Sequence, residues 1–177
     1  RIVKILGLLR HAKSDWGQSD KRDFDRGLNQ RGCKGAELIG RHIRDHGVKW
    51  DKLVASPAQR VKTTLEQAAI GPAPEWNDRL YLASTETIMD VIGETAEEAG
   101  SLLVAGHNPG LGDMVFELVA PKNENALFDE AKVKFPTASF AVFELDIDDW
   151  SQLRDGCGKL VHFARPRDLD PELGPEF

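Results

Sequence analysis

The sequence predicts an α/β fold with a mostly parallel sheet and helices on both of its faces. Short apolar runs rich in β-branched residues alternate along the chain with segments of helical periodicity, and this alternation is typical of βα units. The length of 177 residues corresponds to about one domain. Two apolar runs that lie close together near the C-terminus predict an antiparallel pair, which makes the sheet mixed.

The individual elements follow in order. Residues 2–9 predict a buried strand, and residues 30–46 predict a helix, because apolar side chains recur at helical spacing and Gly47 supplies a stop. Further strands are expected at 52–55, 101–105, 139–145 and 159–163, and further helices at 57–70, 85–99 and 109–119. Residues 75–82 predict an irregular segment or short strand, and 121–137 a loop. We expect one domain over 1–165 and a tail, 166–177, that frays or lies on the surface.

The composition excludes several classes of partner. Lys plus Arg is 23 and Asp plus Glu is 29, so the formal net charge is −6, whereas nucleic acid and anionic membrane surfaces both require a broad basic surface. No apolar run approaches the roughly 20 residues of a membrane-spanning helix. The two cysteines, Cys33 and Cys157, are too few for a disulfide framework. Free thiols in a reducing cytoplasm are therefore expected.

Three polar clusters follow predicted strands, where open α/β sheets gather their ligands. They occupy residues 10–16, 56–60 and 106–112. Ser56 and Asn108 are good N-cap residues, and each is followed by a proline, so two helix N-termini are expected at the same edge of the sheet. These N-termini and the arginines of the clusters predict a site for a compact anion. Phosphate fits best, because a guanidinium group binds its oxygens in pairs.

Two histidines in the same clusters extend binding to catalysis. A neutral imidazole can attack phosphorus, giving a phosphohistidine that water then hydrolyses. We therefore expect His11 to be the nucleophile and Arg10, Arg60 and His107 to stabilise the charge of the transferred phosphoryl group. Four further residues are candidates for substrate contact, although a surface, turn or helix-cap role explains each of them as well: Lys13, Ser14, Arg26 and Asn108.

These residues together resemble the histidine phosphatase, or phosphoglycerate mutase-like, superfamily, and most closely its SixA-type phosphohistidine phosphatases. The resemblance runs from about residue 3 to 165 and is carried by LRHAKS at 9–14, SPAQRVKTT at 56–64 and GHNP at 106–109. It implies a three-layer α/β/α sandwich and catalysis through phosphohistidine without a metal or other cofactor. It also implies the roles given above for His11, Arg10, Arg60 and His107. One departure is Ala12, since most of the superfamily has Gly there; we expect the turn to tolerate a small side chain.

A second departure concerns the proton donor. Phosphomonoester members often use a Glu in a short Leu-x-Glu stretch, and the matching residues 80–84, LYLAS, contain no carboxylate. Glu86 and Asp15 are the candidate substitutes, although neither is in register. A phosphorylated imidazole leaves more easily than an alkoxide, which needs a positioned acid. The missing acid and the short connections, which leave little chain for a lid, favour phosphohistidine on a protein as substrate.

Two alternatives stay open. One is a phosphomonoesterase of the same superfamily that acts on a small phosphate compound. The other, from a different class, is a non-catalytic module that binds phosphorylated partners, although such a module has no need for a nucleophile. The acidic composition adds one expectation for a phosphatase: an acidic surround of the site repels polyanions while it admits a single phosphoryl group.

The remaining histidines are expected to be structural. His42 and His46 lie four residues apart on a predicted helix, a spacing that can bind zinc, but no third ligand accompanies them in the sequence. We expect them to be ordinary residues of the helix face. His162 is expected to be a strand residue with a local partner.

Overall fold

The apolar runs become the strands of a single sheet in the computed structural model, which describes residues 3–17 and 20–174. The sheet has the order β3-β2-β4-β1-β5-β6. Its first four members are parallel, and β5 runs antiparallel to both of its neighbours. The predicted mixed sheet is confirmed. The strands are β1 (Lys4–Arg10), β2 (Lys52–Ala55), β3 (Glu75–Trp76), β4 (Ser101–Gly106), β5 (Phe140–Leu145) and β6 (Gly158–Ala164).

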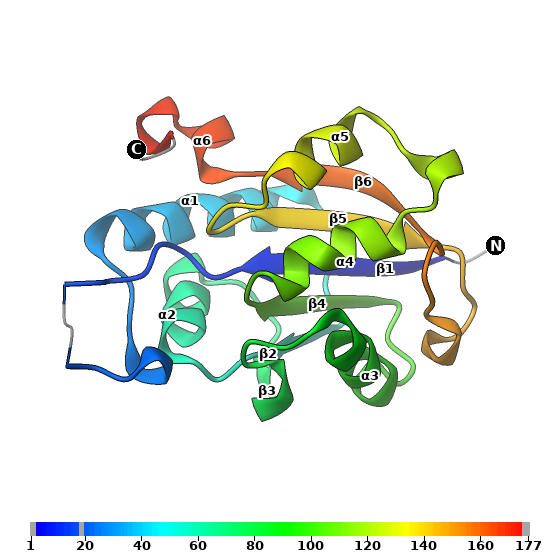
Figure 1. Ribbon diagram of the computed structural model, residues 1–177, viewed down its shortest axis with the longest axis horizontal. Coiled ribbons are helices and arrows are strands. Elements are labelled where there is room, and N and C mark those ends of the chain that lie inside the picture. The colour runs from blue at the N-terminus through cyan, green and yellow to red at the C-terminus, as the bar shows by residue number, and fades with distance from the viewer. Residues whose placement is uncertain (1–2, 18–19, 175–177) are drawn as a thin grey trace.

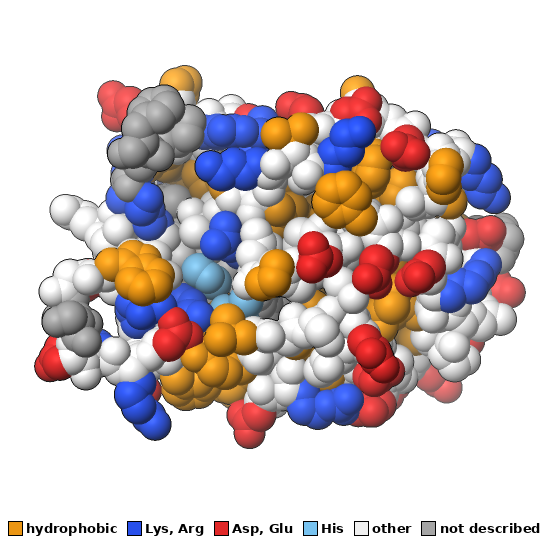
Figure 2. Space-filling model, in the orientation of Figure 1, with side chains coloured by type: hydrophobic (Ala, Val, Ile, Leu, Met, Phe, Trp, Pro, Cys, Tyr) orange, Lys and Arg blue, Asp and Glu red, His pale blue; other side chains and the backbone are white. Residues whose placement is uncertain are grey.

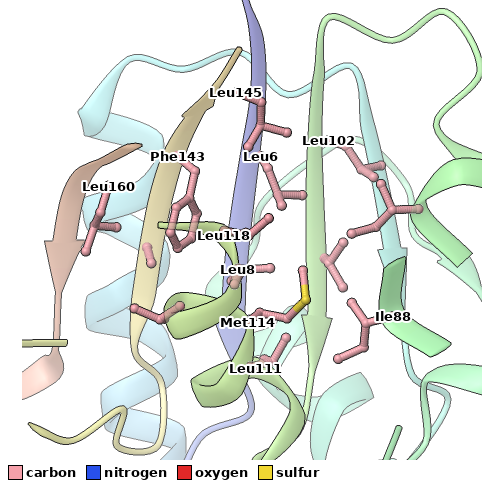
Figure 3. Packing of buried hydrophobic residues seen from close by; sticks show 14 of the residues in the cluster. Leu6, Leu8, Ile88, Leu102, Leu111, Met114, Leu118, Phe143, Leu145 and Leu160 are labelled. Atoms are coloured by element: carbon pink, nitrogen blue, oxygen red, sulfur yellow. The ribbon is translucent and has the colours of Figure 1, made fainter. Parts of the chain in front are cut away.

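Helices cover both faces of this sheet, so the expected three-layer sandwich is also confirmed (Figure 1). One face carries α1 (Gln30–His46) and α2 (Gln59–Ala68), and the other carries α3 (Thr85–Thr95), α4 (Gly110–Leu118) and α5 (Ala126–Val133). Neighbouring side chains of β1 point to opposite faces: Leu8 packs under α3 and α4 (Figure 3), whereas Leu9 packs under α1 and α2. Each fully buried leucine contributes about 1.5–3 kcal/mol.

Two glycines of α1 allow close approaches that position the polar clusters. A Cβ atom at Gly40 would lie 2.1 Å from the carbonyl oxygen of Ala68, so only glycine lets α1 pack this tightly against α2. A Cβ atom at Gly32 would lie 2.1 Å from the carbonyl oxygen of Lys13. The first contact fixes the helix that carries Arg60, and the second fixes the loop that follows β1.

The prediction of a loop over 121–137 is wrong, because this stretch contains α5. The side chain of Asn125 caps the helix by accepting a 2.9 Å hydrogen bond from the backbone N–H of Phe128, and its amide donates to the carbonyl oxygen of Leu160. The helix is only eight residues long, and Phe128 and Ala131 are its buried residues. So short an apolar pattern does not distinguish a helix from a loop; packing against the sheet decides.

The described part of the C-terminal tail is folded on the surface, which is the second of the two predicted alternatives. It forms α6 (Pro166–Leu169) and a 3-10 turn at Pro171–Leu173. Arg31 of α1 holds this segment by donating a 2.7 Å hydrogen bond to the carbonyl oxygen of Gly174. Residues 175–177 of the predicted tail and Ile2 of the predicted first strand lie outside the described residues.

Three histidines outside the polar clusters pack together beside Phe140. The Nε2 atoms of His42 and His162 are 2.7 Å apart and their rings are stacked, while the ring of His46 lies 4.1 Å from that of His162. His42 and His46, expected to be ordinary residues of a helix face, therefore pack against His162 of β6. The partner of His162 is distant in sequence rather than local. Over residues 3–17 and 20–174, no group of three or more His, Cys, Asp or Glu side chains is placed to hold a metal ion. No helix in the same ranges is long and apolar enough to span a membrane.

This cluster predicts a loss of stability in mild acid. Burial, together with the charges of His46 and His42, lowers the pKa of His162 to about 4. In the unfolded chain a histidine has a pKa of about 6.5. As the pH falls from 6.5 toward 4, the unfolded state therefore binds more protons, and the free energy of unfolding decreases.

Replacing His162 with Phe is expected to remove part of this pH dependence, about 1 kcal/mol between pH 6.5 and 5 after allowing for the partial exposure of the ring. Urea denaturation at several pH values measures it, with the wild type as reference. Equal pH slopes for the two proteins would contradict the prediction.

Candidate active site

The three polar clusters meet at the carboxyl ends of β1, β2 and β4. Arg10 pairs with Gly106 across the β1–β4 ladder, and Ala55 pairs with Ala105 across β2–β4. The chain therefore leaves the three strands at one level. Figure 2 shows histidine side chains at the bottom of a hollow on this part of the surface, with Lys and Arg side chains around it. The predicted convergence of the clusters is observed.

His11 lies directly after β1 with its ring buried and oriented by the backbone. Its Nδ1 atom is 2.7 Å from the carbonyl oxygen of Ala12. Since a carbonyl oxygen only accepts hydrogen bonds, Nδ1 carries the proton and Nε2 keeps its lone pair. A chain of hydrogen bonds holds the loop: the N–H of Ala12 donates to the hydroxyl of Thr64, which donates to the carbonyl oxygen of Arg60. The nucleophile candidate and α2 are thereby coupled.

The turn after His11 accommodates Ala12, where most of the superfamily has Gly. Its side chain is 1% exposed and belongs to the apolar cluster under α1 and α2. Its φ angle is not among the positive values recorded for non-glycine residues in the described chain. The turn therefore tolerates alanine, as expected, and the methyl group adds buried apolar surface.

Arg60 is held by an acidic partner that the sequence did not reveal. Its side chain is 4% exposed. Its Nη1 and Nη2 atoms donate to the backbone carbonyl and the carboxylate of Asp23, at 2.8 and 3.1 Å. The same carboxylate accepts hydrogen bonds from Arg26 and from the hydroxyl of Tyr81. Although burial opposes the charged form, these hydrogen bonds and the two arginines lower the pKa of Asp23. Asp23 is therefore a carboxylate that orients Arg60.

The hydroxyl of Ser56 holds the ring of His107. Its Nε2 atom lies 2.7 Å from the Ser56 hydroxyl, and Tyr81 packs edge-on against its ring. The prediction of Ser56 as an N-cap is wrong, because α2 begins at Gln59 and its N-cap is Ala58. Its hydroxyl instead orients an imidazole. The rings of His11 and His107 have centroids 5.4 Å apart, close enough for both to contact one phosphoryl group.

Burial keeps both imidazoles neutral near pH 7. Desolvation, with a smaller effect of the nearby arginines, lowers the pKa of His11 to about 3, and the same two causes lower that of His107 to about 4. Positive charge in the unliganded site therefore comes from Arg10 and Arg60. Among the described residues, the Nδ1 atom of His107 and the Nε atom of Arg10 are buried without a hydrogen-bond partner. An anionic oxygen is the natural acceptor for such donors.

The structure gives each of the four predicted contact residues a different setting. Lys13 lines a cavity beside Arg10, whereas Arg26 donates to Asp23 and stacks on the ring of Trp16. Ser14 is buried and forms a β-bridge with Leu28. The side chain of Asn108 is fully committed, because its amide donates to the carbonyl oxygen of Phe135 and its oxygen accepts from the N–H of Gly112. The N-cap position of α4 is Pro109 rather than the predicted Asn108, but the Asn108 side chain still binds the first turn of the helix and has a structural role.

Neither candidate proton donor is held toward His11. Glu86 is exposed in the first turn of α3 and makes no hydrogen bond or ion pair with any described residue. Asp15 accepts a hydrogen bond from the backbone N–H of Gly17 within its own loop. The carboxylate that does lie among the site residues is Asp23, and its low pKa makes it a poor acid.

Sequence reasoning missed Asp23 and the roles of Ser56, Thr64 and Tyr81. Ser56 and Thr64 lie in the motif at 56–64 and Tyr81 lies in the compared stretch at 80–84, so the sequence marked these three residues without revealing their partners. Asp23 lies in a charged segment with no local pattern, and only its contact with Arg60, 37 residues away, distinguishes it.

The hydrogen bond between Thr64 and Ala12 leads to a testable prediction. Replacing Thr64 with Val keeps the shape of the side chain but leaves the buried N–H of Ala12 without its acceptor. We expect a loss of about 1–3 kcal/mol of stability and a decrease of roughly tenfold in kcat, because the loop that carries His11 is released. Thr63→Val is the matched control, since Thr63 bonds to Gln59 on the surface of the same helix. Unchanged kcat and stability in Thr64→Val would refute this role.

Comparison with known proteins gives several matches. The family described as the histidine phosphatase superfamily (branch 1) matches residues 6–81. An uncharacterised protein of Mycobacterium tuberculosis is 32% identical over 160 residues, which cover 90% of this chain and all of that protein. The SixA structure of Nakamurella multipartitia, assigned as a phosphohistidine phosphatase, has a TM-score of 0.81 at 28% identity and covers 93% of this chain and 96% of its own. The SixA structure of Agrobacterium tumefaciens, with the same assignment, has a TM-score of 0.76 at 29% identity and covers 92% and 98%.

Proposed function

The chain belongs to the histidine phosphatase superfamily, and on that basis we propose that it hydrolyses phosphohistidine on proteins through a covalent intermediate on His11. The observation that carries the proposal is the state of this imidazole. It is neutral, its Nδ1–H is bound to the carbonyl oxygen of Ala12, and its Nε2 lone pair lies in a site that contains two arginines and His107. These are the requirements for attack on phosphorus.

The proposed reaction has two displacement steps. In the first, the lone pair on Nε2 of His11 attacks phosphorus while the bond to the substrate nitrogen breaks. The leaving imidazole departs as a neutral molecule when its other ring nitrogen carries a proton. In the second step, water attacks the phosphorus on His11, the P–N bond breaks, both hydrogens of the water leave with the phosphate, and neutral His11 is restored.

Arg10 and Arg60 stabilise the negative charge that spreads over the transferred oxygens in both steps. His107 contributes a hydrogen bond: with the Ser56 hydroxyl donating to Nε2, its Nδ1–H is a donor without a protein partner. Because the two guanidinium groups supply the positive charge, we expect activity to persist in the presence of EDTA.

The preference for a phosphorylated nitrogen rests on the shortage of acids in the site. An alkoxide leaving group needs a positioned proton donor, which contributes about 10²–10⁴-fold to the rate. Asp23 is engaged by two arginines and Tyr81, and Glu86 and Asp15 are not held toward His11. A phosphohistidine substrate does not need this donor.

A comparison of substrates tests the proposal. We expect a phosphohistidine peptide to be hydrolysed at least about 10²-fold faster than an alkyl phosphate ester, with both rates unchanged in Glu86→Gln and Asp15→Asn. Faster hydrolysis of the ester that depends on Glu86 would instead support the small-molecule phosphomonoesterase. Phosphate binding without turnover of any substrate would support the non-catalytic module.

A further inference from the structure

A cavity of about 230 Å³ lies beside the candidate active site and is lined in part by Arg10. Arg10 and Ala12 are among its lining residues, whereas His11 is not. Four segments that are distant in sequence form its walls: the loop after β1, the first turns of α1, the segment before β5, and the C-terminal tail. Since one water molecule occupies about 30 Å³, the cavity has room for a substituent of a substrate.

The lining of this cavity is strongly basic. Among the described residues, fifteen line it, of which six are Lys or Arg and none is Asp or Glu, although the protein as a whole carries a charge of −6. The lining is thus locally basic within an acidic protein, and Figure 2 shows Lys and Arg side chains also around the neighbouring hollow that contains the histidines. The six cationic residues are Arg10, Lys13, Arg31, Lys134, Arg165 and Arg167.

Acidic side chains of the described chain lie beside some of these cations. Arg165 binds Asp168 and Glu130 at 3.0 and 3.4 Å, outside the lining. Lys134 is exposed at the rim and Arg167 is half-buried. Clustering cations raises their mutual repulsion and is costly unless an anion compensates it. The folded tail contributes Arg167 to this lining, and Arg165 directly precedes the tail.

The cavity is also coupled to the phosphoryl site through the backbone. The N–H of Ala138, a lining residue, donates to the carbonyl oxygen of His11 at 2.9 Å, and Arg10 donates to the carbonyl oxygen of Phe135. A group bound in the cavity thus lies against the same loop that orients the nucleophile.

We infer that this cavity is a subsite for a second anionic group of the substrate, a carboxylate or a phosphate carried near the phosphoryl group that is transferred. This inference rests on the proposed function for the position of the transferred group. For a phosphohistidine protein, the occupant is the carboxylate of an acidic residue beside the phosphohistidine. For a small molecule, it is a second phosphate.

Two pairs of ligands test the subsite and distinguish these sources. One pair is a phosphohistidine peptide with Glu on both sides of the phosphohistidine and the same peptide with Gln. The other is a hexose bisphosphate and the corresponding monophosphate. Both kcat/KM in the wild type and Kd in the His11→Ala background are measured, so that binding is scored even where turnover is absent.

We expect the doubly anionic member of one pair to be preferred by about tenfold. The preference should fall to about twofold or less in the double variant Lys134→Gln, Arg167→Gln, and should weaken as ionic strength rises. Lys132→Gln is the matched control, because Lys132 carries the same charge two residues from Lys134, pairs with Asp129, and does not line the cavity.

The outcomes separate the two claims. No preference in either pair, or a preference that the double variant retains, overturns the subsite even if phosphohistidine is hydrolysed. A preference in Kd that the double variant loses, without wild-type turnover of phosphohistidine, supports the subsite and refutes the proposed function. The pair that shows the preference identifies the source of the second anion.

Discussion

Replacing His11 with Ala is expected to abolish turnover, lowering kcat by at least about 10⁴-fold for every phosphorylated substrate. The variant retains the two arginines and therefore still binds phosphate, but no other group in the site has a free lone pair oriented in the same way. His107, the nearest alternative, has its Nε2 atom bound to Ser56. Single-turnover reactions with ³²P-labelled substrate measure both the rate and the amount of phosphorylated enzyme.

The label in the wild-type protein should be labile in acid and stable in base, as expected for a phosphorylated imidazole, and it should be absent from His11→Ala. His46→Ala is the control, since it removes an imidazole from the cluster beside Phe140 and leaves the site intact. Label that persists in His11→Ala would show that another residue is the nucleophile.

Replacing Arg60 with Lys is expected to lower kcat/KM by about 10²–10³-fold, although the charge is preserved. The guanidinium group of Arg60 is buried and binds Asp23 through two nitrogens, and this planar fork is also what matches two oxygens of a phosphoryl group. A lysine supplies one point charge and cannot serve both partners. Steady-state kinetics and titration with tungstate, a phosphate mimic, measure the loss.

Arg79→Lys provides the matched control, because Arg79 is an exposed arginine that pairs with Glu94 on α3. Asp23→Asn adds a second comparison: it leaves Arg60 in place but removes the carboxylate that orients it, so a loss of about tenfold is expected. An Arg60→Lys enzyme that binds tungstate and turns over like the wild type would exclude Arg60 from the site.

The strands and most helices could be predicted because their information is local. The helix at Gln30–His46 was predicted at its observed bounds because its apolar pattern is long enough to show a period of 3.6. The strand at Lys52–Ala55 was also predicted at its observed bounds, from a short apolar run. The helix expected at 85–99 ends earlier, at Thr95, because helix ends depend on weak capping interactions. In α5 the pattern is too short, and contact with the sheet decides its conformation.

The approximate place of the site was likewise determined by the sequence itself. Strands joined by helices bring their carboxyl ends to one edge, so residues that directly follow them must converge. Arg10, His11, Arg60 and His107 lie close together for this reason. The partners that tune them could not be inferred, since Asp23 meets Arg60, and Thr64 meets Ala12, only through the packing of loops and α2. No periodicity encodes such contacts.

The sequence by itself therefore determined the α/β class and the edge of the sheet where the candidate site lies, and it supplied the residue types on which the proposed chemistry rests, because these depend on local pattern and on chain topology. Only the tertiary structure decided the protonation of the two imidazoles, the engagement of Arg60 by Asp23, and the basic cavity walled by the tail. All three depend on burial and on charges brought together from distant segments. Net charge is a sum over the whole chain, whereas the field in a cavity depends on the few residues that line it.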